Sequence, residues 1–132
     1  IVFEHIPLYP DMHHRIPRSR GGTRKRPNLV EKPRRHHVAW HQIVRNMLAE
    51  EAISFISILW QCQSLQHTGC FVPIRGGIEM PISSIRINPL SFPAQQRAFE
   101  FLFGELGLTP EAMAWEIESW IDPFAQVRYV EQ

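Results

Sequence analysis

The chain has 132 residues, of which 44% are hydrophobic and 20% are charged, and its formal net charge is +1. These values are typical of one small globular domain, or of two very small ones, and they exclude wholesale disorder. No apolar run reaches the roughly 18 residues of a membrane helix, and no signal peptide is predicted, so we expect no membrane partner. A cytoplasmic location is compatible with this, and the compartment stays open.

Charge and histidine are distributed unevenly along the chain. Residues 1–45 hold ten Lys and Arg against three Asp and Glu, whereas residues 46–132 hold four against ten. Six of the seven histidines lie within the first 41 residues. The sequence therefore places the chemistry in the N-terminal third, and it leaves the acidic second half as a candidate surface for a protein partner.

The first half is expected to contain one short strand and two helices. Gly21-Gly22 favours a turn inside a basic loop. A strand is predicted after this loop, and Pro33 ends it. Apolar residues then recur at helical spacing on both sides of Asn46. The predicted elements are an extended, irregular segment at 1–17, a basic loop at 18–27, a strand at 29–32, and helices at about 35–45 and 49–60.

The second half is expected to be mainly helical. A segment rich in Pro, Ser and Gly has strand-like runs at 70–74 and 84–87, and a helix follows at about 93–106. Thr109 is the predicted N-cap of a last helix, because Pro110 suits the first turn and Glu111 suits the helix dipole. The apolar stripe of this helix is Met113, Ile117, Trp120 and Ile121, and the tryptophans at 40, 60, 115 and 120 are all predicted to be core residues.

The two helix pairs resemble each other. A Pro…Arg-Gly-Gly element precedes each pair, at Pro17 and at Pro73, and a Trp ends each pair. Gln96 and Glu100 stand in the second pair where His37 and His41 stand in the first. Two explanations stay open: a duplicated module whose second copy has lost its histidines, or convergence of two amphipathic helix pairs.

Histidine spacing indicates a metal site. His37 and His41 lie four residues apart, so on a helix both side chains share one face and can reach one ion. His13 and His14 are adjacent, and on an extended segment adjacent side chains point to opposite faces. One of them can bind the ion while the other faces the substrate. Three neutral imidazoles suit Zn²⁺, Ni²⁺ or Mn²⁺.

These residues carry a resemblance to a known family. The run HHRIPRSRGG at 13–22, the Asn-Leu-Val at 28–30 and the HHVAWH at 36–41 resemble an HNH endonuclease, and the double histidine most resembles the nuclease domains of DNase colicins. The resemblance implies an α+β chain with a ββα-metal module at 1–60. A mainly helical part at 61–132 would follow, either as a degenerate second copy or as an unrelated helical unit.

The resemblance also implies roles for individual residues. His13, His37 and His41 would bind one divalent ion, and His14 would be the general base that activates water. Asn28 would hold the loop of the base through hydrogen bonds, and Asp11 would orient a metal ligand. His13 stands where Asp is more frequent, which favours softer ions over Mg²⁺ without excluding it. The cations predicted to contact phosphates are Arg15, Arg18, Arg20, Arg24, Lys25, Arg26, Arg34 and Arg35.

The predicted function is metal-dependent hydrolysis of DNA phosphodiester bonds by a one-metal mechanism, with RNA not excluded as a substrate. One alternative is a nucleic-acid-binding module that does not cut and whose metal is structural. Another is a protein-interaction domain. Loss of cleavage in His14→Ala separates the enzyme from both alternatives.

Overall fold

A computed structural model describes residues 2–63, 68–75, 78–79 and 92–131 as a mixed α+β fold. Its helices and strands, in chain order, are β1 (Pro10–His14), β2 (Leu29–Pro33), α1 (Arg34–Val44), α2 (Ala49–Gln63), β3 (Cys70–Arg75), β4 (Ile78–Glu79), α3 (Pro93–Leu106), α4 (Pro110–Trp120) and β5 (Gln126–Val130). Short 3₁₀ helices lie at Phe3–His5, Arg18–Arg20 and Arg26–Asn28. No helix among these residues is long and apolar enough to cross a membrane.

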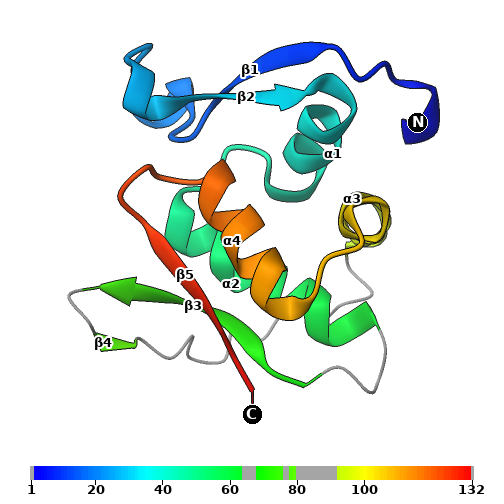
Figure 1. Ribbon diagram of the computed structural model, residues 1–132, viewed down its shortest axis with the longest axis vertical. Coiled ribbons are helices and arrows are strands. Elements are labelled where there is room, and N and C mark those ends of the chain that lie inside the picture. Colours follow the sequence, from blue (N-terminus) through cyan, green and yellow to red (C-terminus); the bar gives the residue numbers. More distant parts are fainter. Residues whose placement is uncertain (1, 64–67, 76–77, 80–91, 132) are drawn as a thin grey trace.

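The first two strands form an antiparallel hairpin that leads straight into a helix. His13 on β1 lies opposite Val30 on β2, and α1 begins directly after Pro33. Figure 1 shows the hairpin and α1 together on one side of the molecule. The prediction of an irregular segment at 1–17 is therefore wrong for residues 10–14. Pro10 begins the strand, no proline follows it before Pro17, and the backbone of residues 10–14 can therefore pair with β2.

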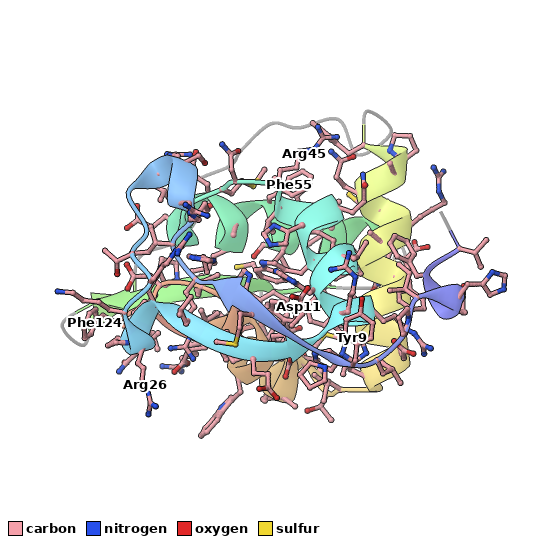
Figure 2. The ribbon with its side chains drawn as sticks, turned by 90° about the horizontal axis from the view of Figure 1, so that it is seen from above. Tyr9, Asp11, Arg26, Arg45, Phe55 and Phe124 are labelled. Carbon is pink, nitrogen blue, oxygen red and sulfur yellow. The ribbon has the colours of Figure 1, made fainter. Side chains whose placement is uncertain are left out.

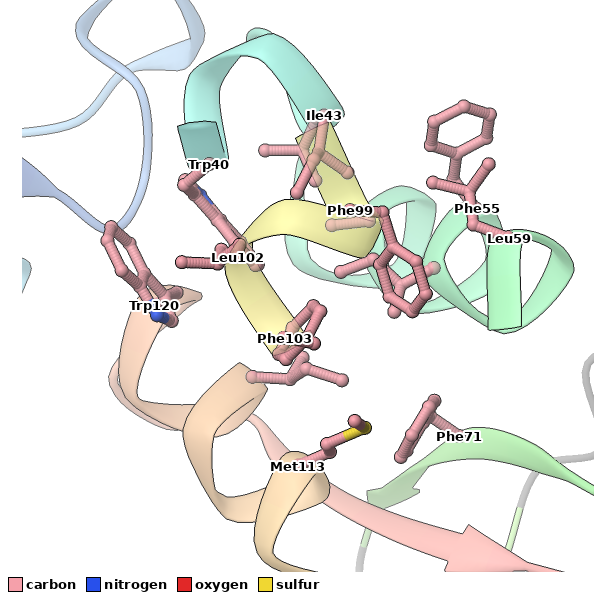
Figure 3. Packing of buried hydrophobic residues seen from close by; sticks show 14 of the residues in the cluster. Trp40, Ile43, Phe55, Leu59, Phe71, Phe99, Leu102, Phe103, Met113 and Trp120 are labelled. Atoms are coloured by element: carbon pink, nitrogen blue, oxygen red, sulfur yellow. The ribbon is translucent and has the colours of Figure 1, made fainter. Parts of the chain in front are cut away.

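All four α-helices of the described residues contribute to one hydrophobic core. Trp40 on α1 stacks on Trp120 of α4, with ring centroids 5.0 Å apart, and Phe99 and Phe103 of α3 lie beside them in the same core (Figure 3). Both parts of the predicted division, 1–60 and 61–132, supply residues to this core. Helix α1, which directly follows the hairpin, therefore packs in this core with α3 and α4 of the second half.

The predicted face of α4 is largely correct. The stripe at 113, 117, 120 and 121 is buried, and the Thr109 hydroxyl caps the helix by accepting a hydrogen bond from the Ala112 amide. Trp115 is 77% exposed, so its assignment to the core is wrong. It lies two residues from Met113, and at 100° per residue that step places it on the opposite side of the helix.

A second, three-stranded sheet has the order β4-β3-β5. The predicted strand at 70–74 is confirmed as β3, whereas the run at 84–87 lies outside the described residues. Strand β5 pairs antiparallel with β3 and has no counterpart among the predicted elements. Its apolar Val127 is flanked by exposed polar residues, so the run carries too little hydrophobic signal to stand out.

The order of elements is similar in the two halves. β1 and β2 precede α1 and α2, and the antiparallel pair β3 and β4 precedes α3 and α4. A Trp lies at or near the C-terminal end of both α2 and α4. Trp120 of α4 contacts the ring of His13 on β1, and Trp60 of α2 contacts the ring of Phe71 on β3. These likenesses agree with duplication, which stays a prediction.

Candidate metal centre

The hairpin and the helix that follows it bring three histidines together. His13 comes from β1, whereas His37 and His41 come from one face of α1. One ring nitrogen of each lies within 4.8 Å of the other two, which makes the three side chains a group that could hold a metal ion. The spacing of four residues thus places His37 and His41 on one face of α1, as the sequence predicts.

His13 presents its Nδ1 atom to this group. The side chain is 2% exposed, and its Nε2 lies 2.6 Å from the carbonyl oxygen of Trp120. Because a carbonyl oxygen only accepts, Nε2 carries the proton, and Nδ1 of the neutral ring then carries a lone pair. Nδ1 is buried and has no hydrogen-bond partner among the described residues. A buried lone pair left unsatisfied in this way is costly unless something binds it.

The two histidines of α1 present their Nε2 atoms. His37 Nδ1 lies 2.8 Å from Asp11 Oδ2, and His41 Nδ1 lies 3.3 Å from the carbonyl oxygen of Arg45. With both Nδ1–H groups donated to these acceptors, each Nε2 carries a lone pair, and the two Nε2 atoms are 2.8 Å apart. Two lone pairs at this distance repel each other unless a proton or a metal ion lies between them.

The donor set fits a divalent ion. Metal-binding histidines characteristically donate their second ring N–H to a carboxylate or a backbone carbonyl, which fixes the tautomer and orients the ring. All three histidines meet this condition, through Trp120, Asp11 and Arg45. Three imidazoles with a side left open are a ligand set that Zn²⁺ and its neighbours take in catalytic sites. The ion's identity does not follow from this geometry.

Burial favours the neutral form of two of the three rings, His13 and His41. Burial lowers the pKa of His13 from 6.5 to about 3, and the charges of His41 and His37 act in the same direction. The pKa of His41 is also lowered, first by desolvation and then by His37. The hydrogen bond from His37 lowers the pKa of Asp11, so this carboxylate stays ionised. Neutral imidazoles are the form that binds metal.

We expect the metal-free protein to lose stability as the pH falls from about 6.5 towards 3. Unfolded His13 binds a proton in this range whereas folded His13 does not, so the free energy of unfolding falls by up to about 1.4 kcal/mol per pH unit from this residue. Urea denaturation of wild type and His13→Gln at several pH values checks this. His13→Gln keeps a donor for Trp120 but does not titrate, so its pH dependence should be shallower, and equal slopes would contradict the assignment.

Alternation along β1 places the His14 side chain on the opposite face of the strand from His13. Its Nε2 atom is buried and has no hydrogen-bond partner among the described residues. Desolvation lowers the pKa of His14, and the charges of Arg18 and Arg24 lower it further. The lowered pKa favours the unprotonated form of His14 beside these two arginines.

Asn28 organises the loop that joins β1 to β2. The side chain is buried; its Oδ1 accepts a hydrogen bond from the Ile16 amide at 2.8 Å, and its Nδ2 donates to Thr23 O at 2.8 Å and to Ile16 O. Gly22 is required nearby, because a Cβ atom there would collide with the Ile16 carbonyl oxygen. These are hydrogen bonds of the kind expected for Asn28, whose part in catalysis stays a prediction.

The eight predicted phosphate-binding cations fall into two groups. Four of them hold the fold together: Arg15 donates to Ser119 O, and ion pairs join Arg20 to Glu51, Arg34 to Asp11, and Arg35 to Glu105. The other four are exposed on the loop between β1 and β2 and form no ion pair among the described residues; they are Arg18, Arg24, Lys25 and Arg26. Figure 2 shows Arg26 and Asp11 well apart, Arg26 at the loop of the hairpin and Asp11 toward its other end.

An open hollow of about 380 Å³ lies beside the face of α1 that carries His37 and His41. It is lined by Asp11, Arg34, His37, Val38, His41 and Gln42. A ligand in this hollow would lie against the two α1 histidines and Arg34.

Two groups at the site are backbone carbonyls that sequence reasoning misses. Trp120 O and Arg45 O each accept from a candidate ligand, and a carbonyl is present at every residue, so no side chain marks these positions. Arg45 does have an unusual backbone, with φ at +53° in a turn closed by Met47 N to Val44 O. Glycine is the residue preferred at such a φ, so no sequence signal pointed to Arg45.

Comparisons of the chain with protein-family models, with curated proteins and with solved structures find no match.

Proposed function

We propose that this protein is a metal-dependent endonuclease that hydrolyses DNA phosphodiester bonds, with β1, β2 and α1 forming an HNH-type ββα-metal module. The observation that carries the proposal is the set of three inward-facing imidazole nitrogens whose opposite nitrogens are all engaged by Trp120, Asp11 and Arg45. A surface cluster of histidines has no reason to satisfy every outer nitrogen in this way, whereas a metal centre does.

In the proposed mechanism each residue of the site has a separate role. A divalent ion bound by the three histidines would polarise a phosphodiester and stabilise the departing oxygen. His14 would accept the proton of the attacking water, which its lowered pKa allows at neutral pH. Asn28 would keep the backbone after His14 in place through its bonds to Ile16.

The exposed loop between β1 and β2 would attract the phosphates of nucleic acid by its positive charge. Arg18, Arg24, Lys25 and Arg26 lie on the same loop that begins after His14, so a phosphate backbone held by them passes beside the base. Contacts of this kind are independent of base sequence and weaken with salt. DNA is the substrate that we propose, and single-stranded and RNA substrates belong in the same assay.

The test is cleavage of supercoiled plasmid by metal-stripped protein, with Mg²⁺, Mn²⁺, Ni²⁺ or Zn²⁺ added back separately. We expect nicked or linear plasmid with at least one ion and none with chelator. His41→Ala should be inactive with every ion, because it removes one of the three ligands from an exposed position that the core does not need. A gel shift without cleavage under any ion would instead favour a binding module with a structural metal.

A further inference from the structure

The C-terminal end of α4 lies against the hairpin and receives three of its side chains. His13 Nε2 donates to Trp120 O at 2.6 Å, Arg15 Nε donates to Ser119 O at 3.1 Å, and Lys32 Nζ donates to Ser119 Oγ at 2.6 Å. Figure 1 shows this end of α4 directed at the hairpin. The last carbonyls of a helix carry partial negative charge, so donors and cations placed there are stabilised.

Lys32 anchors this contact from the strand opposite β1. Its side chain is 12% exposed, and its ammonium lies 3.4 Å from Glu116 Oε1 and 4.6 Å from the centre of the Trp120 ring. The same Glu116 oxygen accepts the Trp120 indole N–H at 3.0 Å. A largely buried lysine is costly unless it is paired, and here the carboxylate, the Ser119 hydroxyl and the ring all compensate it. Lys32, Glu116 and Ser119 are called the α4 clamp below.

The clamp contacts the residue whose carbonyl is the acceptor for His13 among the described residues. Trp120 is held through its indole by Glu116 and through its ring by Lys32, while its carbonyl faces His13. If that carbonyl moved away, Nδ1 could carry the ring proton instead of Nε2, and the lone pair would leave the metal-binding face.

We propose that the α4 clamp is a positioning device for the metal centre: Lys32, Glu116 and Ser119 hold Trp120 O against His13 so that Nδ1 of His13 faces the ion. The second half of the chain is then part of the site and does more than support the hairpin. This inference rests on the metal centre of the proposed function, although it does not require that the protein cuts DNA.

The first test needs no variant. Nitrogen-15 NMR of the metal-free wild type at neutral pH reports the tautomer of each histidine, and we expect His13 to carry its proton on Nε2. A His13 ring protonated on Nδ1 would overturn the inference, whatever the nuclease assay gives.

The second test measures Co²⁺ affinity and the visible Co²⁺ absorption spectrum in variants of the clamp. Lys32→Met removes the ammonium and keeps the apolar stem, and the double variant Lys32→Met/Glu116→Gln avoids leaving a carboxylate unpaired. Glu118→Gln is the matched control, because Glu118 lies on the same helix but accepts from Val127 N of β5. Loss of a partner that orients a ligand typically weakens metal binding about 10- to 100-fold.

We expect at least about a tenfold weaker Co²⁺ affinity and an altered spectrum in both clamp variants, with mixed His13 tautomers, and Glu118→Gln unchanged. A purely structural clamp would lower the free energy of unfolding and leave spectrum and tautomer as they are, which would overturn the inference. Absence of Co²⁺ binding in the wild type would overturn it as well. If wild type binds Co²⁺ as expected but never cleaves nucleic acid, the proposed function fails and the positioning role stands.

Discussion

His14→Ala is expected to lower the rate of plasmid cleavage by about 10²- to 10⁴-fold, the usual contribution of a general base. His14 lies next to the candidate ligand His13 on β1, and strand alternation places it on the other face, where Arg18 and Arg24 act on it. The variant removes the proposed proton acceptor and leaves all three candidate ligands in place. Initial rates of nicking at saturating metal measure the effect.

Metal affinity is the control for this variant. His14→Ala should bind Co²⁺ as tightly as the wild type, since the three nitrogens that face one another belong to His13, His37 and His41. A variant that cleaves at the wild-type rate would remove His14 from the mechanism. A variant that has lost both cleavage and Co²⁺ binding would show that His14 supports the metal centre and is not the base.

Trp120→Ala is expected to lower the free energy of unfolding by about 3–5 kcal/mol, the range for truncating a large buried aromatic side chain. Trp120 is fully buried, stacks on Trp40 and lies under the ammonium of Lys32. Its loss opens a cavity where the core of the second half meets the hairpin. Urea denaturation followed by circular dichroism measures the change.

Trp115→Ala is the matched control, with the same substitution on the same helix. Because Trp115 is 77% exposed, its truncation should change the free energy of unfolding by no more than about 0.5 kcal/mol. Equal destabilisation by the two variants would contradict the orientation of α4, and with it the placement of Trp120 O beside His13.

The sequence predicts the side chains of this site better than their surroundings. The spacing of His37 and His41 fixes a shared helix face, and the His13-His14 pair needs only strand alternation, so both follow from local geometry. The acceptor for His13 comes from 107 residues further along the chain and is a backbone carbonyl, which no local pattern marks. Only the packing of α4 against the hairpin brings it into place.

Contacts between residues distant in sequence also decide which cations are paired and whether β5 forms, and local patterns predict neither. Eight cations look alike in the sequence, and only tertiary partners such as Glu51, Glu105 and Ser119 distinguish four that contact other parts of the fold from four that form no ion pair among the described residues. Helices α3 and α4 are predictable because each has a long apolar stripe and a recognisable end. Strand β5 has five residues and gains its stability from pairing with β3, which is distant in sequence.

A calorimetric titration of metal-free protein with Zn²⁺, run beside His41→Ala, tests the central claim most directly. The geometry of His13, His37 and His41 predicts one ion per wild-type chain and an affinity weakened by more than about 100-fold in the variant, beyond the effect of losing an outer partner. Absence of saturable binding by the wild type, or equal binding by both proteins, would show that these three histidines do not form a metal centre.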